Sequence, residues 1–365
     1  MQTSDATMLE SVWSAVEYRV VGDGVFYPDL ARMRRSIDTW ASWLSEWSSL
    51  ADEYETLAGK AEADGHVVTA GEHFWQASLC MHFGQFLWFH RPEEKDRAQR
   101  RKVELYQRAA PMLRPVAERV EVEFDGLRMP GFLRLPGGGS PSPCVILIGG
   151  LDSTKEESYH FENACLTRGI ATFSFDGPGQ GECYSQRPLV PDFERYVSAV
   201  VDFLETRNEI EADRIGILGR SLGGYYAARS AAHDPRLAAC AIFGALANLG
   251  HLDEIPPQTQ LGFEYVTGLG DRGEARARVK EYVDLGDLPS RIRQPLFVLH
   301  GALDVIVPVA QAQELHEAAP SEDKTLWIVP DGIHCAHNRY HLVRRPLADW
   351  LASRLGAPPA SVANP

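Results

Sequence analysis

Hydrophobic and polar positions follow two different patterns along the chain, and the change lies near residue 116. Before it, hydrophobic residues recur every three or four positions, a spacing that places them on one face of an α-helix. The long run 30–65 shows this spacing in Trp40, Trp43 and Trp47. It predicts one helix, and two further runs predict a second and a third helix, over 68–90 and 93–113. We therefore expect a helical N-terminal domain over residues 1–115.

Aromatic residues are concentrated in this helical region. Six of the eight tryptophans fall before residue 90, namely Trp13, Trp40, Trp43, Trp47, Trp75 and Trp88. Aromatic stripes at helical spacing are expected to pack against one another and against the next domain. Part of the same aromatic surface could also cover a substrate pocket, since such pockets are lined mainly by apolar and aromatic side chains.

From residue 116 onward, short hydrophobic runs alternate with amphipathic helical segments. Residues 119–136 alternate in polarity and predict an antiparallel hairpin. Six continuous hydrophobic runs follow, in "CVILIGG", "IATFSFDG", "RIGILG", "AACAIFGA", "QPLFVLHG" and "KTLWIVPDG", with helices expected at about 156–168 and 192–207. Runs of this kind form strands that are buried on both faces. The pattern predicts an α/β domain over 116–358 whose mostly parallel sheet is covered by helices on both faces.

One segment interrupts the alternation of strands and helices. Residues 247–290 are polar and rich in proline at first and then helical, in "GEARARVKEYVDL". Because the segment follows a strand of the predicted sheet, we expect a lid insertion above the carboxyl edge of that sheet. The last residues, 359–365, belong to a proline- and alanine-rich stretch that we expect to be disordered.

Length and charge narrow the class of protein. A chain of 365 residues favours two domains, or one core with a large insertion. Its 36 basic and 50 acidic residues give a net charge of −14, which argues against nucleic acid or a membrane surface as the main partner. The first ten residues lack the basic and apolar regions of a secretion signal, so we expect none. No window approaches the roughly 18 apolar residues of a membrane helix. We expect a soluble, cytoplasmic protein.

Cysteine and glycine patterns give no sign of a metal or a cofactor. The six cysteines show no C-x-x-C spacing, and several lie in apolar runs, so we expect buried, inert thiols. The glycine patterns "GPGQG" (177–181) and "GLGDRG" (268–273) lack the strand and helix that flank a dinucleotide or phosphate site. We expect no cofactor and no metal.

The stretch "RIGILGRSLGGYYAARSAA" (214–232) carries the first candidate for chemistry. A hydrophobic run ends in Gly-Arg-Ser-Leu-Gly-Gly, and a helical pattern follows. G-x-S-x-G between a strand and a helix predicts a sharp turn that exposes Ser221 at the top of a sheet as a nucleophile. Gly219 and Gly223 would leave the room that so tight a turn needs.

A serine nucleophile needs a histidine base and an acid that orients this base. In this architecture both follow the serine, each at the carboxyl end of a later strand. "PLFVLHGALDVIVP" places Asp304 after one strand, and "TLWIVPDGIHCAHN" places His334 after the next. His337 is an alternative base and Asp331 an alternative acid, although the Pro-Asp-Gly context of Asp331 is typical of a turn. His300 also ends a strand, where we expect it to be packed in the core or to support the site without taking part in the chemistry.

Two backbone amides are candidates for the oxyanion hole. The N–H of Leu222 would lie at the start of the helix after Ser221. Gly149 and Gly150 permit a close backbone approach after the strand "CVILIGG". We therefore expect the N–H of Leu151 to be the second donor, although these glycines could also serve the turn alone.

Several longer motifs carry a family resemblance: "GGLDSTKEES" (149–158), "FDGPGQGE" (175–182), "ILGRSLGG" (217–224), "DPRLAAC" (234–240) and "DGIHCAHN" (331–338). Together they closely resemble the α/β-hydrolase family typified by dihydroxypseudooxynicotine hydrolase, over roughly residues 116–355, and the helical N-terminal region is also like that family's. The resemblance implies the α/β-hydrolase fold, with residues 1–115 as a helical cap domain, the triad Ser221, Asp304 and His334, and a homodimer.

The resemblance also implies a reaction, which is hydrolysis of a C–C bond beside a ketone in a 1,3-diketone or in a polyketide-like or aromatic ketone. An additional acid is implied in the segment after "AACAIFGA", where Asp253 and Glu254 are the candidates. A neutral acid there, with its pKa raised by burial, could protonate the leaving carbanion, as could protonated His334. Three alternative functions stay open: an ester, lactone or thioester hydrolase, a biosynthetic cyclase or lyase, and a binding protein on a hydrolase fold.

Overall fold

The chain forms two compact units. The computed structural model describes residues 5–139 and 141–357, so the expected disorder of residues 359–365 lies outside the described part. One unit comprises residues up to 118 together with 156–160, and the other comprises 119–155 and the residues from 161 onward. The division falls at 118 instead of 115, and it assigns 156–160 to the helical unit. The reason is that this segment makes its buried contacts with helices.

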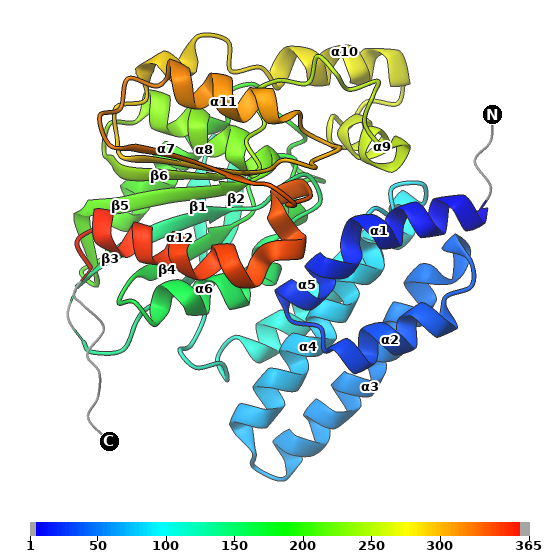
Figure 1. The fold of residues 1–365 in the computed structure, drawn as a ribbon. Helices are drawn as coiled ribbons and strands as arrows, with labels where there is room; N and C mark the ends of the chain where they lie inside the picture. Colours follow the sequence, from blue (N-terminus) through cyan, green and yellow to red (C-terminus); the bar gives the residue numbers. More distant parts are fainter. Residues whose placement is uncertain (1–4, 140, 358–365) are drawn as a thin grey trace. The chain divides into compact units, whose positions relative to one another are not determined.

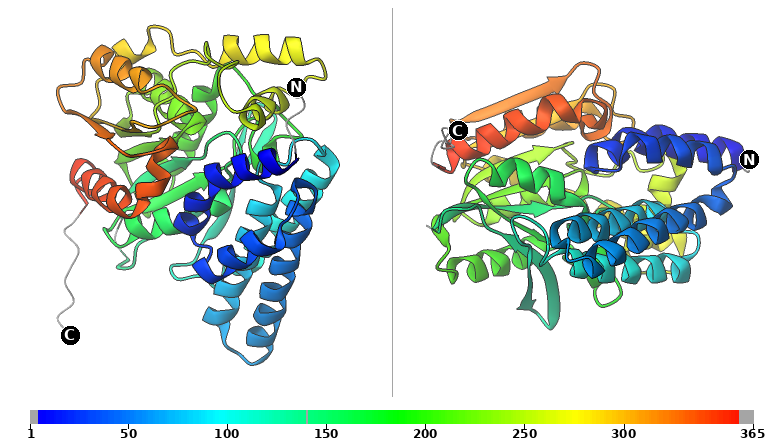
Figure 2. Two further views of the ribbon diagram at one scale, coloured as in Figure 1. Left: turned by 45° about the vertical axis from the view of Figure 1, so that its right-hand side comes forward. Right: turned by 90° about the horizontal axis from the view of Figure 1, so that it is seen from below.

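The helical unit contains α1 (Asp5–Asp23), α2 (Tyr27–Ser36), η1 (Trp40–Ser42), α3 (Trp43–Ala63), α4 (Val67–Gln85) and α5 (Pro92–Ala109) (Figure 1). The single helix expected over 30–65 is wrong, because the chain breaks between α2 and α3. At this break the side chain of Thr39 accepts a hydrogen bond from the N–H of Ser42, 3.2 Å away, and caps the next helix. Figure 2 shows α3, α4 and α5 side by side.

The tryptophans form the core of this unit. All six are at most 5% exposed. The ring centroids of Trp13 and Trp43 are 4.5 Å apart, and those of Trp40 and Trp88 are 5.0 Å apart. Tilted contacts at these distances are favourable for aromatic pairs. The aromatic stripes therefore pack against one another, as their spacing predicted.

The segment 156–160 joins the helical unit through buried ion pairs. Glu156 accepts a contact from Lys102 at 3.1 Å, and Glu157 contacts Arg19 at 2.5 Å and Nε2 of His82 at 2.7 Å. Burial lowers the pKa of His82, and the nearby carboxylate of Glu157 only partly opposes this effect. Ionised groups removed from water need such partners, so each of these contacts holds the segment in place.

The second unit is built on an eight-stranded sheet with the order β1-β2-β4-β3-β5-β6-β7-β8. Its strands are β1 (Glu118–Phe124), β2 (Leu127–Arg134), β3 (Ser142–Ile148), β4 (Ala171–Phe175), β5 (Ile210–Arg220), β6 (Leu237–Phe243), β7 (Leu296–Gly301) and β8 (Lys324–Val329). The strands from β3 to β8 pair in parallel, and β2 pairs with β4 antiparallel. Asp125 and Gly126 form the two-residue turn of the predicted hairpin, both with positive φ.

Helices cover both faces of this sheet (Figure 1). Alternate residues of β3 face opposite sides. Val145 and Leu147 pack with α6 (Tyr159–Leu166) and α12 (Tyr340–Arg354). Ile146 belongs to the core shared with α7 (Phe193–Glu205), α8 (Leu222–His233) and α11 (Val309–Ala318). Short 3₁₀ turns complete the connections, η2 (Lys155–Ser158), η3 (Gly181–Cys183) and η5 (His334–Arg339). The predicted α/β architecture with a mostly parallel sheet is confirmed.

The insertion expected over 247–290 leaves the sheet after β6 and contains α9 (Pro257–Val266), α10 (Arg272–Tyr282) and the start of η4 (Leu288–Arg291). It is tied to the α/β core at several points. Tyr184 stacks on Tyr265 with ring centroids 4.4 Å apart, and the hydroxyl of Tyr225 donates to the carbonyl of Tyr282 at 2.6 Å. These contacts fix both helices of the insertion to the α/β unit.

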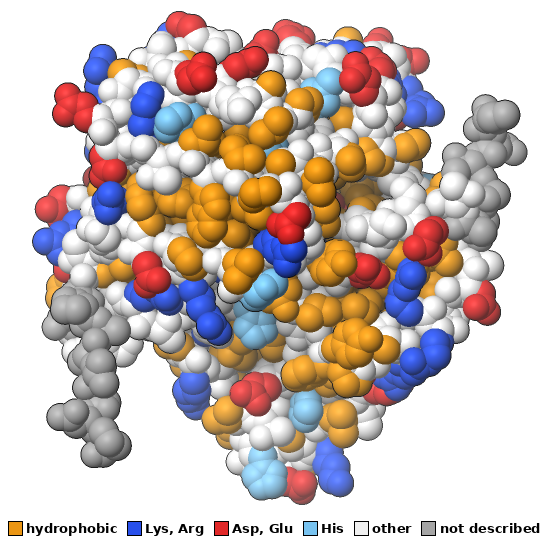
Figure 3. Space-filling view, in the orientation of Figure 1, with side chains coloured by type: hydrophobic (Ala, Val, Ile, Leu, Met, Phe, Trp, Pro, Cys, Tyr) orange, Lys and Arg blue, Asp and Glu red, His pale blue; other side chains and the backbone are white. Residues whose placement is uncertain are grey.

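Cysteines and surface charge also bear on the expectations from sequence. All six cysteines are buried and unpaired, and burial raises the pKa of the Cys240 thiol to about 12, as expected of inert thiols. Acidic and basic side chains are interspersed on the face shown in Figure 3. Within the described part of the chain, every helix is too short or too polar to cross a membrane.

Candidate active site

Ser221 lies in the sharp turn that its sequence context predicted. β5 ends at Arg220 and α8 begins at Leu222, so Ser221 alone connects strand and helix. Its backbone has φ 56° and ψ −119°, a region that non-glycine residues rarely adopt. The N–H of Ser221 donates to the carbonyl of Phe243 at the end of β6, at 2.8 Å. This bond anchors the turn to the neighbouring strand.

Two glycines are required by the close packing around this turn. A Cβ atom on Gly219 would lie 1.8 Å from the carbonyl oxygen of Gly223. A Cβ atom on Gly223 would lie 2.2 Å from the carbonyl oxygen of Ile148 in β3. Both distances are far below van der Waals contact, so any larger residue would force the strand and the helix apart. The steric role expected for the two glycines is therefore confirmed.

Asp304 and His334 meet after the last two strands of the sheet. Asp304 follows β7, and His334 follows β8 at the start of η5. Nδ1 of His334 lies 2.7 Å from Oδ2 of Asp304. The other carboxylate oxygen, Oδ1, accepts the N–H groups of Ile306 and Val307 at 2.8 and 2.9 Å. The carboxylate is thus held on both oxygens, and it can orient the imidazole.

Charge coupling determines the ionisation of this pair. Burial opposes the ionisation of Asp304, but the positive charge of His334 and its hydrogen bond outweigh this effect and hold the pKa of the carboxyl below its usual range. Burial likewise opposes protonation of His334, but the Asp304 carboxylate dominates and raises the pKa of the imidazole well above 6.5. This arrangement stabilises an imidazolium, which is the form that a catalytic base adopts after it has accepted a proton.

His300 supports the acid instead of replacing the base. Its fully buried ring contacts the carbonyl of Val307 through Nε2 at 3.0 Å and accepts the N–H of Ala245 on Nδ1 at 3.2 Å. Burial lowers the pKa of His300, and both contacts fit one neutral tautomer. Nε2 also lies 3.5 Å from Oδ2 of Asp304. The ring therefore packs beside the acid, which fits the expectation of a packed or supporting residue and adds its position.

The two alternative residues, Asp331 and His337, have different surroundings. Asp331 is exposed and forms an ion pair with Arg339, whose hydrogen bond and charge lower the pKa of this carboxyl. His337 is buried within η5, but the histidine that contacts Asp304 is His334.

Phe243 connects the serine turn to the histidine loop. Its carbonyl accepts the N–H of Ser221 at 2.8 Å and also the thiol of Cys335 at 3.2 Å. Sγ of Cys335 lies 3.6 Å from Nε2 of His334. The thiol of Cys335 therefore contacts both the end of β6 and the candidate base. Sequence reasoning assigned no such role to Cys335. Its only sequence signal is that it directly follows the candidate base.

Leu222 and Leu151, the expected oxyanion donors, follow β5 and β3 respectively. Leu222 opens α8, where backbone N–H groups have no partner within the helix. Leu151 follows Gly150, where a Cβ atom would lie 3.1 Å from Cβ of Ser221. The loop after β3 therefore runs directly against the serine turn.

Asp253 does not have the environment expected of an additional acid. Its exposed carboxylate pairs with Lys280 at 2.7 Å and with Arg276. Hydrogen bonds and charge from Lys280 and Arg276 lower its pKa, which is the opposite of the expected effect. The prediction of a buried, neutral acid at Asp253 is therefore contradicted. Glu254 is also exposed.

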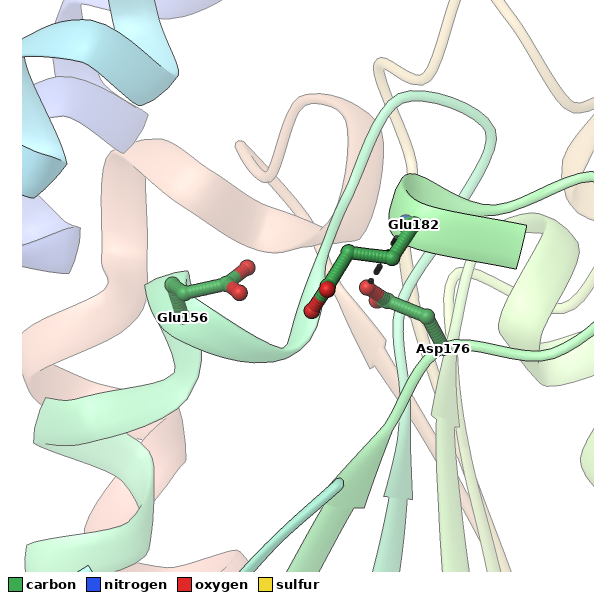
Figure 4. Close-up of side chains that lie close together, drawn as sticks. All are labelled: Glu156, Asp176 and Glu182. Atoms are coloured by element: carbon green, nitrogen blue, oxygen red, sulfur yellow. Dashed lines mark hydrogen bonds between the residues drawn. The ribbon is translucent and has the colours of Figure 1, made fainter. Parts of the chain in front are cut away.

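The motif at 175–182 contributes an acidic pair in the same unit. Figure 4 shows Asp176 and Glu182, with the N–H of Glu182 donating to Oδ2 of Asp176 at 3.2 Å. The ammonium of Lys155 contacts both carboxylates, at 2.7 Å for Asp176 and 2.6 Å for Glu182. A cation of the protein itself thus lies between these two carboxylates. Both motifs are visible in the sequence, but this cluster was not predicted from them.

A mostly parallel eight-stranded sheet, covered by helices on both faces and carrying a strained serine turn after β5, defines the class of the α/β-hydrolases. Comparisons with known proteins narrow the class further. Residues 39–257 match the model of the esterase FrsA-like family, and residues 192–357 match that of the prolyl oligopeptidase family. The chain belongs to the FrsA-like family of α/β-hydrolases and is an enzyme of the hydrolase class.

Individual relatives support this assignment. The chain is 46% identical to 2,6-dihydropseudooxynicotine hydrolase of Paenarthrobacter nicotinovorans over 335 residues, which cover 91% of this chain and 90% of the relative. The crystal structure of the 2,6-dihydroxy-pseudo-oxynicotine hydrolase matches with a TM-score of 0.87 and 44% identity, covering 94% of this chain and 98% of that chain. The 20-hydroxy-prefusarin hydrolase of Gibberella moniliformis is 34% identical, over 54% of this chain and 51% of the relative.

Proposed function

We propose that this enzyme is a serine hydrolase that cleaves a C–C bond beside a ketone in a 1,3-diketone or a related polyketide-like or aromatic ketone. Ser221 is the nucleophile, His334 the general base and then acid, and Asp304 the residue that orients the imidazole. The observation that carries this proposal is the 2.7 Å contact between Asp304 and His334, in the same unit as the strained turn of Ser221. Similarity to the pseudooxynicotine hydrolase supports the choice of substrate class.

The first half of the reaction forms an acyl-enzyme. His334 takes the hydroxyl proton of Ser221 while Oγ attacks the ketone carbon, and the carbonyl oxygen becomes an oxyanion. The N–H groups of Leu151 and Leu222 stabilise this charge. The C–C bond then breaks, its electron pair leaves as an enolate of the neighbouring carbonyl, and the imidazolium of His334 returns the proton to carbon.

The second half hydrolyses the acyl-enzyme. His334 removes a proton from water, the resulting hydroxide adds to the ester carbon, and the carboxylic acid leaves as Oγ of Ser221 regains its proton. Because ion pairs keep Asp253 ionised, protonated His334 is the proton donor that we favour in the first half. Its raised pKa favours the imidazolium that this donation requires.

Two measurements test the nucleophile. We expect a fluorophosphonate probe to label the wild-type enzyme at Ser221 and to leave Ser221→Ala unlabelled. Ser185→Ala removes an exposed serine and is the matched control, so it should label and turn over like the wild type. Catalysis by Ser221→Ala at more than about 1% of the wild-type rate would contradict an acyl-enzyme, since loss of the nucleophile in such triads costs several orders of magnitude.

A substrate panel tests the bond that is cleaved. Purified enzyme is offered aryl 1,3-diketones and simple aryl esters of matched size, and products are identified by mass spectrometry. We expect carboxylic acid and methyl ketone fragments from the diketones. Rapid turnover of esters without cleavage of any diketone would contradict C–C hydrolysis and leave the triad intact.

Hydrolysis of esters, lactones or thioesters is the second candidate. The observation in its favour is the match of residues 39–257 to a family described as esterases. The same triad and oxyanion donors serve this reaction, but the leaving group is an alkoxide or thiolate, which needs less help than a carbanion. The substrate panel separates the two candidates.

A further inference from the structure

The loop expected to carry the Leu151 amide is held at both ends by one short segment of the same unit. This oxyanion loop runs from Gly149 to Lys155, directly after β3. The segment 176–182, which we call the clamp, follows β4, the neighbouring strand in the sheet. The clamp contains the motif "DGPGQGE", so its function is a question that the sequence raised and the triad does not answer.

Gln180 holds the first end of the oxyanion loop. Its Nε2 donates to the carbonyl of Gly149 at 2.8 Å, and its Oε1 accepts the N–H of Gly177 at 3.2 Å. The side chain is buried, so water cannot readily replace either bond. The side-chain amide of Gln180 therefore donates to the oxyanion loop and accepts from the clamp.

Asp176 holds the second end. Oδ1 accepts the backbone N–H of Lys155 at 3.0 Å, and Oδ2 accepts its ammonium at 2.7 Å. A Cβ atom on Gly181 would lie 2.1 Å from Oδ2 of Asp176, so the clamp closes tightly around this carboxylate. Inside the loop, the N–H of Ser153 donates to the carbonyl of Gly150 at 3.2 Å. Leu151 thus lies between two fixed points.

We propose that Gln180 is a positioning residue for the oxyanion hole, because its hydrogen bond to Gly149 fixes the distance between the Gly149–Leu151 backbone and the serine turn. The inference rests on the proposed function of Ser221 and Leu151 and deepens it. An oxyanion donor acts only when it lies at hydrogen-bond distance from the position of the developing charge. A displacement of about 1 Å can cost about 100-fold in rate. Gln180 does this without touching the substrate.

The test uses two substitutions of Gln180 in the full-length enzyme. Gln180→Met keeps the volume but removes both hydrogen bonds. Gln180→Glu keeps the acceptor for Gly177 and, when ionised, places a carboxylate against the carbonyl of Gly149. Gln186→Met is the matched control, because Gln186 is exposed and lies in the same connection between β4 and α7.

We expect both Gln180 variants to lose about 10- to 100-fold in kcat/KM for an aryl ester and in the rate of Ser221 labelling by a fluorophosphonate. The Ki of a trifluoromethyl ketone, which forms an oxyanion at the site, should rise by the same factor. The Ki of the carboxylic acid product should stay within about twofold of the wild type in both variants, and the pH midpoint of the reaction should stay at the wild-type value in Gln180→Met. For Gln180→Glu the deficit should narrow as the pH falls, because the protonated acid can again donate to Gly149.

The outcomes separate this inference from the proposed function. Wild-type labelling at Ser221 with unchanged rates in both folded Gln180 variants would overturn the positioning role alone. An equal rise in the Ki of the ketone and of the product would also overturn it, since that result indicates a collapsed pocket. If Gln180→Met does not fold, the pH-dependent recovery of Gln180→Glu decides the question. Absence of Ser221 labelling in the wild type would overturn both proposals.

Discussion

At the scale of single residues, the serine turn illustrates how strain is maintained. A non-glycine residue at φ 56° and ψ −119° costs on the order of 1–3 kcal/mol and persists only where its surroundings enforce it. Here the enforcement comes from the Phe243 carbonyl and from the close contact that Gly219 and Gly223 allow. The serine side chain is thereby kept at the end of the strand instead of folding back into the sheet.

Gly219→Ala should disrupt this turn. The added methyl group would meet the Gly223 carbonyl at 1.8 Å, so we expect a loss of about 2–3 kcal/mol in the free energy of unfolding and loss of Ser221 labelling. Gly59→Ala is the control, because it lies within α3 with open space around it and should stabilise the protein by about 0.5–1 kcal/mol. Chemical denaturation and probe labelling measure both effects, and a labelled, stable Gly219→Ala would contradict the steric argument.

The pH dependence of catalysis should reveal the coupling of Asp304 and His334. The base must be neutral to act, and Asp304 raises its pKa, so kcat/KM should rise with pH through a midpoint above 6.5. Asp304→Asn removes the negative charge but keeps an acceptor for Ile306 and Val307. We expect this midpoint to move down, with a loss of activity of about 10⁴-fold.

The pH midpoint and the activity of both proteins are measured by steady-state kinetics and by rates of Ser221 labelling between about pH 5 and 9. A wild-type midpoint at or below 6.5 would contradict the coupling. An unchanged midpoint in Asp304→Asn would also contradict the coupling.

At the scale of elements, two connecting segments were harder to predict than the helices and strands they join. The run 30–65 has continuous helical spacing, yet the chain leaves the helix after Ser36 and restarts with a cap at Thr39. Segment 156–160 was expected to belong to the α/β domain because it lies between two of its strands in sequence. Its carboxylates instead pair with Arg19 and Lys102, which lie on helices α1 and α5 of the helical unit.

Lys102→Met should measure the strength of that attachment. The substitution leaves the buried carboxylate of Glu156 without the cation 3.1 Å away, so we expect the free energy of unfolding to fall by about 3–5 kcal/mol. Arg100→Met removes an exposed ion pair with Asp96 on the same helix, and this control should change stability by less than about 1 kcal/mol. Tryptophan fluorescence during denaturation reports mainly on the helical unit, which contains six of the eight tryptophans. Equal effects of the two substitutions would contradict the attachment of 156–160 through Lys102.

At the scale of the whole molecule, the family resemblance implies a homodimer, which stays a prediction, and one feature of the surface favours it. Phe26 and Tyr27 are 57% and 71% exposed at the start of α2, although large aromatic residues are usually buried or in interfaces. We expect a homodimer, with a mass by light scattering twice that of the 40.5-kDa chain.

Replacing both aromatic residues by serine should shift the distribution toward the monomer if they contribute to the interface. A single species of 40.5 kDa throughout the micromolar range would contradict the expectation of a dimer.

The sequence by itself determined the helical character of the N-terminal region, the strands of the sheet and the order of the two along the chain. The period of hydrophobic positions is a local property, so it predicted the helical region and the buried strands. The G-x-S-x-G motif between a strand and a helix predicted the turn at Ser221. The placement of Asp304 and His334 after consecutive strands was also predictable, because the carboxyl ends of parallel strands lie at one edge of a sheet.

Only the tertiary structure decided which partner each charged or polar side chain found. Asp253 lies in a plausible segment for an acid, but Lys280 on α10 keeps it ionised. Gln180 lies in a glycine-rich motif whose sequence predicts no role for it, and only the folded structure shows that its amide donates to the Gly149 carbonyl. Such contacts join residues that are far apart in the chain. The pKa values and positions of these side chains depend on burial and on distances to their partners, and hydrophobic periodicity encodes neither.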